Sequence, residues 1–448
     1  MPETSEFVIR GGHVLTMDEA GDLPGADVHV RGDRIHAVGQ ALAAQGVPEV
    51  GARGMIVLPG FVDTHWHMWN TLLRSMSGDE PGSGYFRNSV ELGRAFLSED
   101  IYQGTRLACA EAIYSGITYV HDWCHNVRDP ACAESSLAAL AESGLRARYS
   151  YGYAAGHPND DPMDLAALAR MHDAWEAHDA DGLISLGMAW RGTGGSNPAM
   201  RVAPEIYRRE IAAARELGLP VTVHASGPPA AAGQIAALDR EGLLGPDLQV
   251  VHANNATEAE IAALASAGTA VSISPFTELL IGYGLTRTRD FRAAGIRCGL
   301  SADTTMLSGN ADMFATMKLT LAVENGIAHD EFALTARQVL ALATIDGARS
   351  MGLEADIGSL RPGKRADIIL VSPAAPNVAV FTDPARMLVT AAQPANVDTV
   401  IVGGRFLKRS GALTTLDPGQ VSREAQAALA KVLRRAAAPG NVPLRPRP

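Results

Sequence analysis

Strand-like and helix-like segments alternate between Pro59 and Leu360, and this alternation constrains the fold more than any other feature of the sequence. Such an order is typical of βαβ units with a parallel sheet. Polar residues recur at the ends of the strand-like segments, as expected of a closed barrel whose site is built from strand ends. We therefore predict an α/β fold, a (β/α)8 TIM barrel, with strands at residues 61–65, 117–122, 146–151, 183–190, 220–224, 248–252, 269–274 and 296–301.

The two ends of the chain carry short β-type runs that are separated by glycine and proline. They lie between residues 6 and 58 and at 366–371 and 399–406, and each set is small for an independent sheet. We therefore expect both ends to pair into one small β-sandwich domain. The predicted division is residues 1–58 and 363–412 for the small β domain, 59–362 for the barrel and 413–448 for a C-terminal helix and tail.

Helical patterns are expected at residues 99–114, 131–143, 203–217, 257–267 and 311–324, and over 335–351 as a final covering helix. An amphipathic helix is also expected at 421–437. It would be a surface helix or an oligomer contact, and a frayed appendage is the alternative.

Composition narrows the function classes. The formal net charge of −11 argues against nucleic-acid binding, which needs excess lysine and arginine. The four cysteines show no CxxC spacing and no disulfide-scaffold density, which favours a reducing cytoplasm. The first residues, MPETSEFVIRGG, lack the basic flank and apolar run of a signal peptide, and no stretch is apolar enough for a membrane span. We expect a soluble cytoplasmic protein with no membrane partner.

Histidine and aspartate stand at four of the expected strand ends. His65 and His67 are two residues apart after the first strand and would share one face of it. His224 ends the fifth strand, His252 the sixth, and Asp303 follows the eighth. Each alone could be structural, since a buried histidine is often simply hydrogen-bonded and Asp303 could cap the next helix. On a barrel all of them would face one cavity, which favours a divalent metal site.

The chain resembles the amidohydrolase superfamily at these strand ends and in several longer segments. The segments are PGFVDTHWH, HANNATEAEIAALASAGTAVSISP, DMFATMKL and ATIDGARSMGLEADIGSLRPGKRADIILV. Within it the chain is similar to the cytosine deaminase-like branch, which includes S-adenosylhomocysteine deaminases, guanine deaminases and triazine hydrolases. The resemblance implies that His65, His67, His224 and Asp303 ligate the ion. It also implies catalytic roles for Asp303, as acceptor of the water's proton, and for His252, which would orient the hydroxide and stabilise developing charge.

The metal is expected to be one divalent ion, Zn²⁺ with Fe²⁺ as the alternative. Superfamily members that bridge two metals use a carboxylated lysine after the fourth strand, where this chain has Trp190 and Arg191. A single ion would lower the pKa of a bound water toward about 7, so one ion suffices for hydrolysis.

The chain departs from the branch at Gly227, three residues after His224. Deaminases of the branch carry at that place a glutamate that protonates the substrate ring, and glycine cannot transfer a proton. Glu278, after the seventh strand, is a candidate replacement, with a plain surface carboxylate as the alternative. His121 and His125 could touch the substrate or be structural.

Aromatic residues gather at the expected strand ends, although only 5% of the chain is aromatic. They favour a planar or apolar substrate, with plugging of the barrel top as the alternative. Asn70 stands where triazine and guanine hydrolases of the branch place a substrate-binding glutamine. The expected substrate-binding residues are Asn70, Trp69, Trp123, His125, Trp190 and Glu278.

The sequence thus predicts a metal-dependent hydrolase that attacks a carbon–nitrogen bond. We expect an aminohydrolase, or deaminase, for a small aromatic or N-heterocyclic compound, in a homodimer or homotetramer. The alternatives are an amide, urea or carbamate hydrolase, a hydrolytic dehalogenase, and a non-catalytic scaffold that kept the fold.

Overall fold

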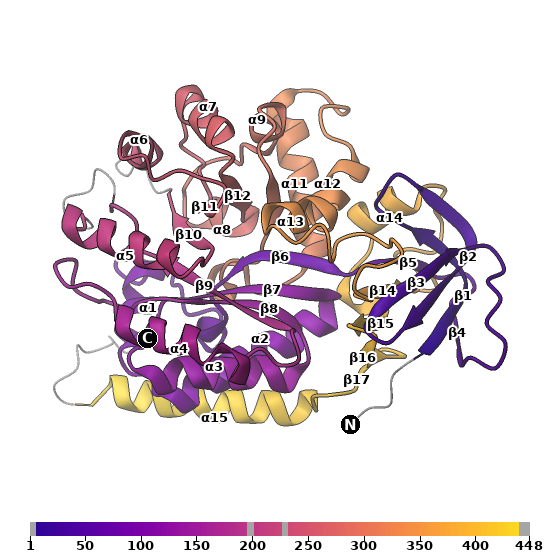
Figure 1. Ribbon diagram of the computed structural model, residues 1–448, viewed down its shortest axis with the longest axis horizontal. Coiled ribbons are helices and arrows are strands. Elements are labelled where there is room, and N and C mark those ends of the chain that lie inside the picture. The colour runs from indigo at the N-terminus through magenta and orange to yellow at the C-terminus, as the bar shows by residue number, and fades with distance from the viewer. Residues whose placement is uncertain (1–5, 195–200, 226–231, 439–448) are drawn as a thin grey trace.

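The computed structural model describes residues 6–194, 201–225 and 232–438, and in them eight parallel strands form the central barrel (Figure 1). Strands adjacent in sequence are adjacent in the sheet. Each lies within two residues of its predicted bounds, so the predicted α/β barrel is confirmed. The strands are β6 (Phe61–Trp66), β7 (Ile117–Cys124), β8 (Arg146–Tyr151), β9 (Ile184–Trp190), β10 (Val221–His224), β11 (Leu248–Val251), β12 (Ala270–Ile273) and β13 (Cys298–Leu300).

The barrel closes between its first and last strands at two of the residues marked by the sequence. The backbone N–H of Asp303 donates to the carbonyl of His65 over 2.9 Å, and the N–H of His67 donates to the carbonyl of Asp303 over 2.7 Å. Trp66 and Asp303 form the corresponding parallel bridge. Closure of the barrel therefore brings the His65-Trp66-His67 segment beside Asp303.

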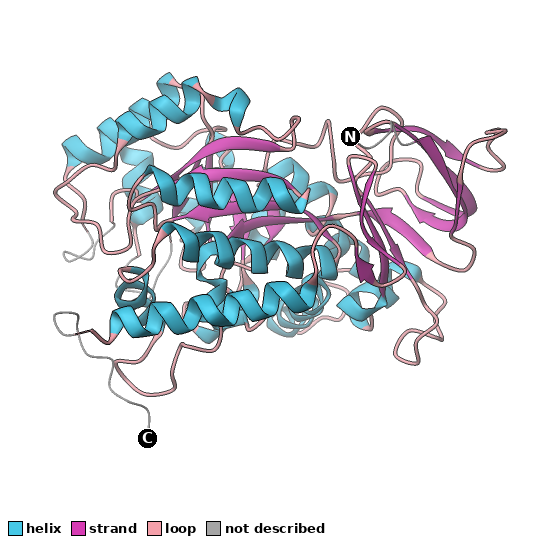
Figure 2. Cartoon of the chain, turned by 90° about the horizontal axis from the view of Figure 1, so that it is seen from below, coloured by secondary structure: helices cyan, strands magenta, loops and turns pink. Residues whose placement is uncertain are grey.

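Helices surround the strands, as Figure 2 shows. They include α2 (Ser98–Ser115), α3 (Pro130–Ser143), α4 (Leu165–Asp173), α5 (Pro204–Glu216), α6 (Gln234–Arg240), α7 (Glu258–Ala267), α9 (Thr288–Ala293) and α11 (Met313–Ala328). Shorter elements lie near the carboxyl ends of the strands: η1 (Met68–Leu73), α1 (Tyr85–Gly93), α8 (Pro275–Leu280) and α10 (Thr305–Ser308). The element η2 (Trp175–Ala177) follows α4.

The single covering helix predicted over residues 335–351 is wrong. The chain forms α12 (Ala336–Leu342) and α13 (Ile345–Ser350), and the break lies at Thr344, whose φ of −132° and ψ of −102° are not helical. Gly347 lies inside α13 and does not cause the break.

Strands from both chain ends form the small domain, as predicted, to the right of the barrel in Figure 1. They belong to one nine-stranded sheet in the order β17-β16-β15-β14-β5-β1-β2-β3, with β4 paired to β1. The antiparallel pair of β5 and β14 joins the two ends. The strands are β1 (Glu6–Leu15), β2 (Asp22–Arg31), β3 (Arg34–Gly39), β4 (Glu49–Gly51), β5 (Ile56–Pro59), β14 (Ile368–Val371), β15 (Val397–Val402), β16 (Arg405–Arg409) and β17 (Ala412–Leu413). The connection from β14 to β15 contains α14 (Pro384–Thr390) and η4 (Pro394–Asn396).

The expected strand over residues 399–406 is a hairpin instead. Gly403 and Gly404, with φ of 53° and 74°, reverse the chain between β15 and β16. Both lie in the left-handed region that glycine enters without steric cost, so the pair turns the chain where the apolar pattern alone suggested a continuous strand.

The C-terminal helix α15 (Pro418–Ala436) packs along α2 beneath the barrel in Figure 1. Its buried face is apolar, and Arg435 pairs with Asp100 while Arg106 of α2 pairs with Glu424. These contacts exclude a frayed appendage. In the part of the chain that the structure describes, no helix combines the length and apolar character that crossing a membrane requires.

Candidate metal centre

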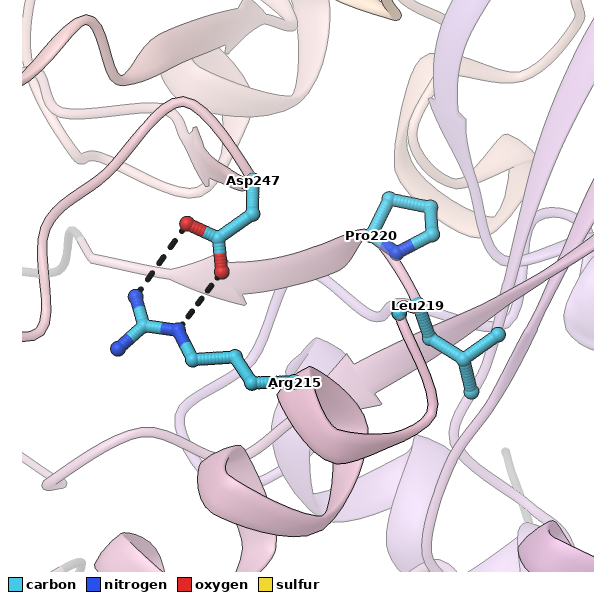
Figure 3. Close-up of a pocket in the computed structure, with 5 residues that line it drawn as sticks. Arg215, Leu219, Pro220 and Asp247 are labelled. Carbon is cyan, nitrogen blue, oxygen red and sulfur yellow. Dashed lines mark hydrogen bonds and ion pairs between the residues drawn. The ribbon is translucent and has the colours of Figure 1, made fainter.

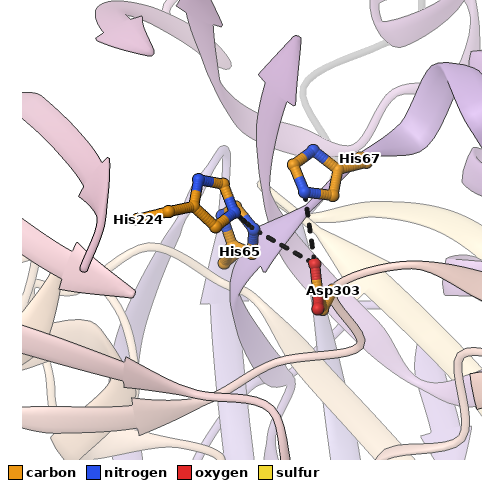
Figure 4. A group of neighbouring side chains, drawn as sticks. All are labelled: His65, His67, His224 and Asp303. Atoms are coloured by element: carbon orange, nitrogen blue, oxygen red, sulfur yellow. Dashed lines mark hydrogen bonds and ion pairs between the residues drawn. The ribbon is translucent and has the colours of Figure 1, made fainter. Parts of the chain in front are cut away.

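Four side chains from three parts of the barrel converge at the carboxyl ends of the strands (Figure 4). The Nε2 atoms of His65 and His67 lie 3.2 and 3.3 Å from Oδ1 of Asp303. The Nε2 atom of His224, at the end of β10, lies 3.1 Å from Nε2 of His65. One ligand atom from each of the four residues lies within 4.8 Å of all the others.

The donor set fits a single divalent ion. Ligands bound tetrahedrally at about 2.0–2.1 Å are roughly 3.3 Å apart, which matches the closest separations here. Burial lowers the pKa of His65 to about 3 and that of His224 well below its ordinary value. Both imidazoles are therefore neutral near pH 7, and neutral imidazole is the form that binds a metal.

Neighbouring groups orient the His67 ring and hold the backbone of His65. The Nδ1–H of His67 donates to the carbonyl of Trp123 over 3.1 Å, which leaves Nε2 free to face the cluster. Asp63 accepts the backbone N–H of His65 over 3.1 Å and that of Ala302 over 2.8 Å. One buried carboxylate thus joins the ends of β6 and β13 and sets the spacing between His65 and Asp303.

His252 lies beside the four-residue cluster. Its Nε2 is 3.8 Å from Oδ2 of Asp303, and its Nδ1 is 3.1 Å from Oε1 of Glu278. Burial alone would lower the pKa of His252, but the hydrogen bond to Glu278 and the charges of Asp303 and Glu278 raise it. His252, Ala253 and Asp303 have φ of 76°, 57° and 56°, a backbone region that non-glycine residues seldom enter. Such conformations are concentrated at functional sites.

Three of the predicted substrate-binding residues, Trp69, Trp123 and His125, form an aromatic group beside His67. The His125 ring centroid is 4.3 Å from that of His67, and the Trp123 ring is 4.3 Å from that of His224. Trp69 Nε1 donates to His125 Nδ1 over 3.4 Å. Trp69 and Trp123 have 0% and 1% of their surface exposed, so both rings are packed inside the barrel top.

Asn70 connects the cluster's surroundings to α1. Its Oδ1 accepts the hydroxyl of Thr304 over 3.0 Å, and its Nδ2 donates to the hydroxyl of Tyr85 over 3.5 Å. Sequence reasoning missed Tyr85 and Thr304. Thr304 directly follows Asp303, which is a usable signal, whereas Tyr85 lies on a separate helix and its place depends on tertiary packing.

Trp190, also expected to bind substrate, is fully buried at the end of β9, where it pairs in register with Val223 of β10. Its neighbour Arg191 forms a buried ion pair with Glu210 of α5 and donates to the carbonyls of Pro158 and Asp161. The side chain that follows β9 therefore ties α5 to the loop before α4.

His121 and Glu278 are both buried near the cluster. His121 has both ring nitrogens bonded, to the Thr64 carbonyl over 2.9 Å and to the Ser150 hydroxyl over 2.8 Å, which supports the structural alternative. Glu278 is 0% exposed, so the alternative of a surface carboxylate is wrong. Gly227 lies outside the described residues.

A depression of about 480 Å³ lies away from this chemistry, at the amino end of β10 (Figure 3). Its lining includes the exposed Arg215–Asp247 ion pair, with Nε 2.8 Å from Oδ2, and Pro220. His224 is at the opposite end of the same strand. Barrel enzymes bind their substrates at the carboxyl ends of the strands, so this depression is not the candidate site.

Comparisons with known proteins agree with this geometry. Residues 56–407 match the model of the amidohydrolase family. The chain is 31% identical to a 5-methylthioadenosine/S-adenosylhomocysteine deaminase of Moorella thermoacetica over 88% of this chain and 92% of that protein. It is 28% identical to a 5'-deoxyadenosine deaminase of Methanosarcina mazei over 96% and 99% of the two chains.

Two solved structures share the architecture. An adenosine deaminase from Xanthomonas campestris with bound zinc has a TM-score of 0.83 and 26% identity, covering 97% of this chain and 100% of that one. An atrazine chlorohydrolase from Arthrobacter aurescens complexed with zinc has a TM-score of 0.82 and 22% identity, covering 94% and 100%, and shows the shared fold alone. The match over residues 56–407 agrees with the barrel and with the convergence of three histidines and an aspartate. The chain therefore belongs to the amidohydrolase family.

Proposed function

We propose that the chain is a zinc-dependent aminohydrolase that removes an amino group from a small N-heterocyclic compound. The observation that carries the proposal is the convergence of His65, His67, His224 and Asp303 on one point. Curated relatives named as deaminases support it, and adenine-containing nucleosides are therefore the first substrate class to test.

The four ligand residues would hold the ion, which would lower the pKa of a water molecule toward about 7 and so supply the nucleophile. Asp303 would accept the proton of that water at Oδ2, the carboxylate oxygen 3.8 Å from Nε2 of His252, and would return it to the amino group, which leaves as ammonia when the carbon–nitrogen bond breaks. His252 would orient that water through Nε2, the ring nitrogen that faces Asp303. The walls formed by the buried Trp69 and Trp123 and the partly buried His125 would keep bulk water away from the metal side of the site.

The position of Asn70 supports the proposal that amide and hydroxyl groups orient the substrate. It lies with Tyr85 and Thr304 beside Asp303, where the three groups would offer both donors and acceptors to a heterocycle. We propose Asn70, Trp69, Trp123 and His125 as the residues that shape the substrate pocket, with Trp190 behind them.

A second candidate function rests on Gly227. Deaminases of the branch that this chain resembles carry at this place a glutamate that protonates the substrate ring. Hydrolysis of an amide, urea, carbamate or carbon–chlorine bond depends less on ring protonation. Gly227 favours this alternative, while the deaminase relatives favour the first proposal.

The test is a substrate panel with zinc-loaded protein. We expect ammonia release from at least one of 5'-deoxyadenosine, 5-methylthioadenosine, S-adenosylhomocysteine, adenosine, guanine, cytosine or an aminotriazine. Protein stripped of metal should release none, and zinc should restore the activity. If none of these amines releases ammonia, while amides or ureas release an amine or chlorotriazines release chloride, the second proposal replaces the first.

Metal analysis of the purified protein tests whether the chain is a metal-dependent enzyme. We expect about one zinc per chain, and we expect the His224→Ala variant to lose it. A wild-type chain with no bound zinc or iron would support a scaffold that kept only the fold. We also propose a cytoplasmic homodimer or homotetramer, in keeping with four free, buried cysteines, and light scattering in solution tests the oligomer.

A further inference from the structure

Glu278 is a buried carboxylate whose two oxygens are both used inside the protein. It lies on α8, the short helix that follows β12, and none of its surface is exposed. Oε1 accepts the backbone N–H of Ser274 over 2.8 Å and the Nδ1–H of His252 over 3.1 Å. Oε2 accepts Nδ2 of Asn254 over 3.1 Å. A carboxylate that binds substrate needs an oxygen directed at the substrate, and these contacts engage both oxygens elsewhere.

The contact with Glu278 determines which nitrogen of His252 faces the site. A carboxylate can only accept, so Nδ1 of His252 carries a hydrogen toward Oε1. The other nitrogen, Nε2, faces Oδ2 of Asp303 at 3.8 Å. A histidine ring between two acidic groups is held in one orientation, and the partner of one nitrogen sets the role of the other.

The local backbone supports this arrangement from both sides. His252 and Ala253 have left-handed conformations, which turn the chain at the end of β11 and bring Asn254 back toward Glu278. Asn254 also donates to the carbonyl of Leu285 over 3.1 Å, and the N–H of Tyr283 donates to the carbonyl of Glu278 over 2.9 Å. The turn after β11 and the segment after β12 are thus bound to each other around the His252–Glu278 contact.

We infer that Glu278 is a positioning residue for the hydrolytic reaction: it holds the His252 ring with Nδ1–H toward itself and Nε2 toward the reacting atoms, and Asn254 holds Glu278. The inference rests on the proposed function. It assigns Glu278 a different task from the direct substrate contact expected from the sequence, because Glu278 acts through His252. The arrangement follows the general logic in which a catalytic histidine is oriented by a buried carboxylate.

Kinetics of three substitutions test the inference. Glu278→Ala removes the acceptor and should lower kcat by about 100-fold, while Glu278→Gln keeps an acceptor oxygen and should lower it by about 10-fold. KM should stay within about threefold in both, because neither change removes a substrate contact. Zinc content should stay at the wild-type level. Glu278→Asp, with a shorter reach, should fall between the other two.

Glu324 provides a matched control. It is also a buried carboxylate and accepts the Thr286 hydroxyl and the backbone N–H groups of Thr288 and Arg289, but none of these partners is a histidine of the site. Glu324→Gln should lower the free energy of unfolding as much as Glu278→Gln does and leave kcat per folded molecule unchanged.

A second readout needs no substrate. In the nitrogen NMR spectrum of zinc-loaded, histidine-labelled protein, His252, assigned by the His252→Ala variant, should carry its hydrogen on Nδ1 in the wild type and in Glu278→Gln. In Glu278→Ala that signal should weaken or move to Nε2. An unchanged tautomer, an effect confined to KM, or full activity of Glu278→Ala would overturn the inference. If no substrate is turned over, the proposed function fails while the tautomer still decides this inference.

Discussion

Two histidine–glutamate pairs of nearly equal length lie in different regions of the molecule. On the small sheet, His29 Nε2 is 3.0 Å from Oε1 of Glu6, whose side chain is 37% exposed and also contacts Arg31. At the barrel mouth, His252 Nδ1 is 3.1 Å from Oε1 of Glu278, which is fully buried. Water and salt weaken the first pair, whereas the second can be separated only by leaving buried polar groups unpaired. Distance alone therefore does not distinguish the two pairs, whereas burial of the glutamate does.

The backbone differs between the same two regions. In the small sheet the left-handed non-glycine residues Met17 and Ser410 lie in turns between strands, whereas the barrel mouth places His252, Ala253 and Asp303 in the left-handed region at the site. Such conformations cost on the order of 1–3 kcal/mol each and persist where the surrounding structure enforces them. Local backbone preference therefore yields at residues of the site in the barrel mouth, and in turns away from the site in the small sheet.

The largest effect should come from His224, the proposed metal ligand at the end of β10. His224→Ala should remove the metal and lower kcat/KM by roughly 1,000-fold or more, because the ion contributes several kcal/mol of transition-state stabilisation. Zinc analysis and ammonia release measure this. His29→Ala, which removes a buried histidine of the small sheet, is the control and should keep both. Retained zinc in the His224 variant would separate His224 from the ligand set.

Removal of the carboxylate between β6 and β13 should have the next largest effect. Asp63→Ala leaves the buried N–H groups of His65 and Ala302 without this acceptor, which should lower the free energy of unfolding by about 2–5 kcal/mol. Zinc affinity should fall by about 10- to 100-fold. Asp27→Ala removes a comparable buried acceptor from the small sheet, where it bonds Arg10, Gly11 and Leu42. It should cost stability and leave zinc affinity unchanged, as urea unfolding and zinc titration would show.

A pH-dependent effect should come from Lys408 of β16. Burial lowers the pKa of this lysine to about 8, while its Nζ donates to the carbonyl of Tyr114 over 2.9 Å. In the unfolded chain its pKa is about 10.4, so between about pH 8 and pH 10.4 the unfolded state binds more protons. This residue therefore makes stability rise with pH across that window. Denaturant unfolding should show that Lys408→Met lacks this part of the rise, and equal slopes for both proteins would contradict the assignment.

The smallest effect should come from Glu6, the exposed partner of His29 in the comparison. Glu6→Gln removes the charge beside His29 and Arg31 at the surface, where solvent already screens it. We expect zinc content and kcat within about twofold of wild type, since the pair lies on the small sheet. A loss comparable to that of Glu278→Gln would mean that burial does not separate the two pairs.

Much of the fold could be predicted because the strands carry strong local signals. The eight barrel strands, the pairing of the chain ends, the amidohydrolase family and a hydrolase of carbon–nitrogen bonds are confirmed. The sequence pattern did not predict the hairpin at Gly403 or the helix break at Thr344. Hydrophobic periodicity shows that an element exists but does not show where the chain turns within it. The site residues other than the four convergent ones remain proposals.

Which side chains stand at the strand ends can be inferred from the chain alone, since a strand followed by a polar residue is a local property. What those side chains touch depends on how distant segments pack together. Asp63 meets Ala302 across 239 positions of sequence, and Glu278 meets His252 across 26. Both contacts depend on barrel closure and on the left-handed turn after β11. No local pattern records such contacts, because their geometry arises from the packing of the whole barrel.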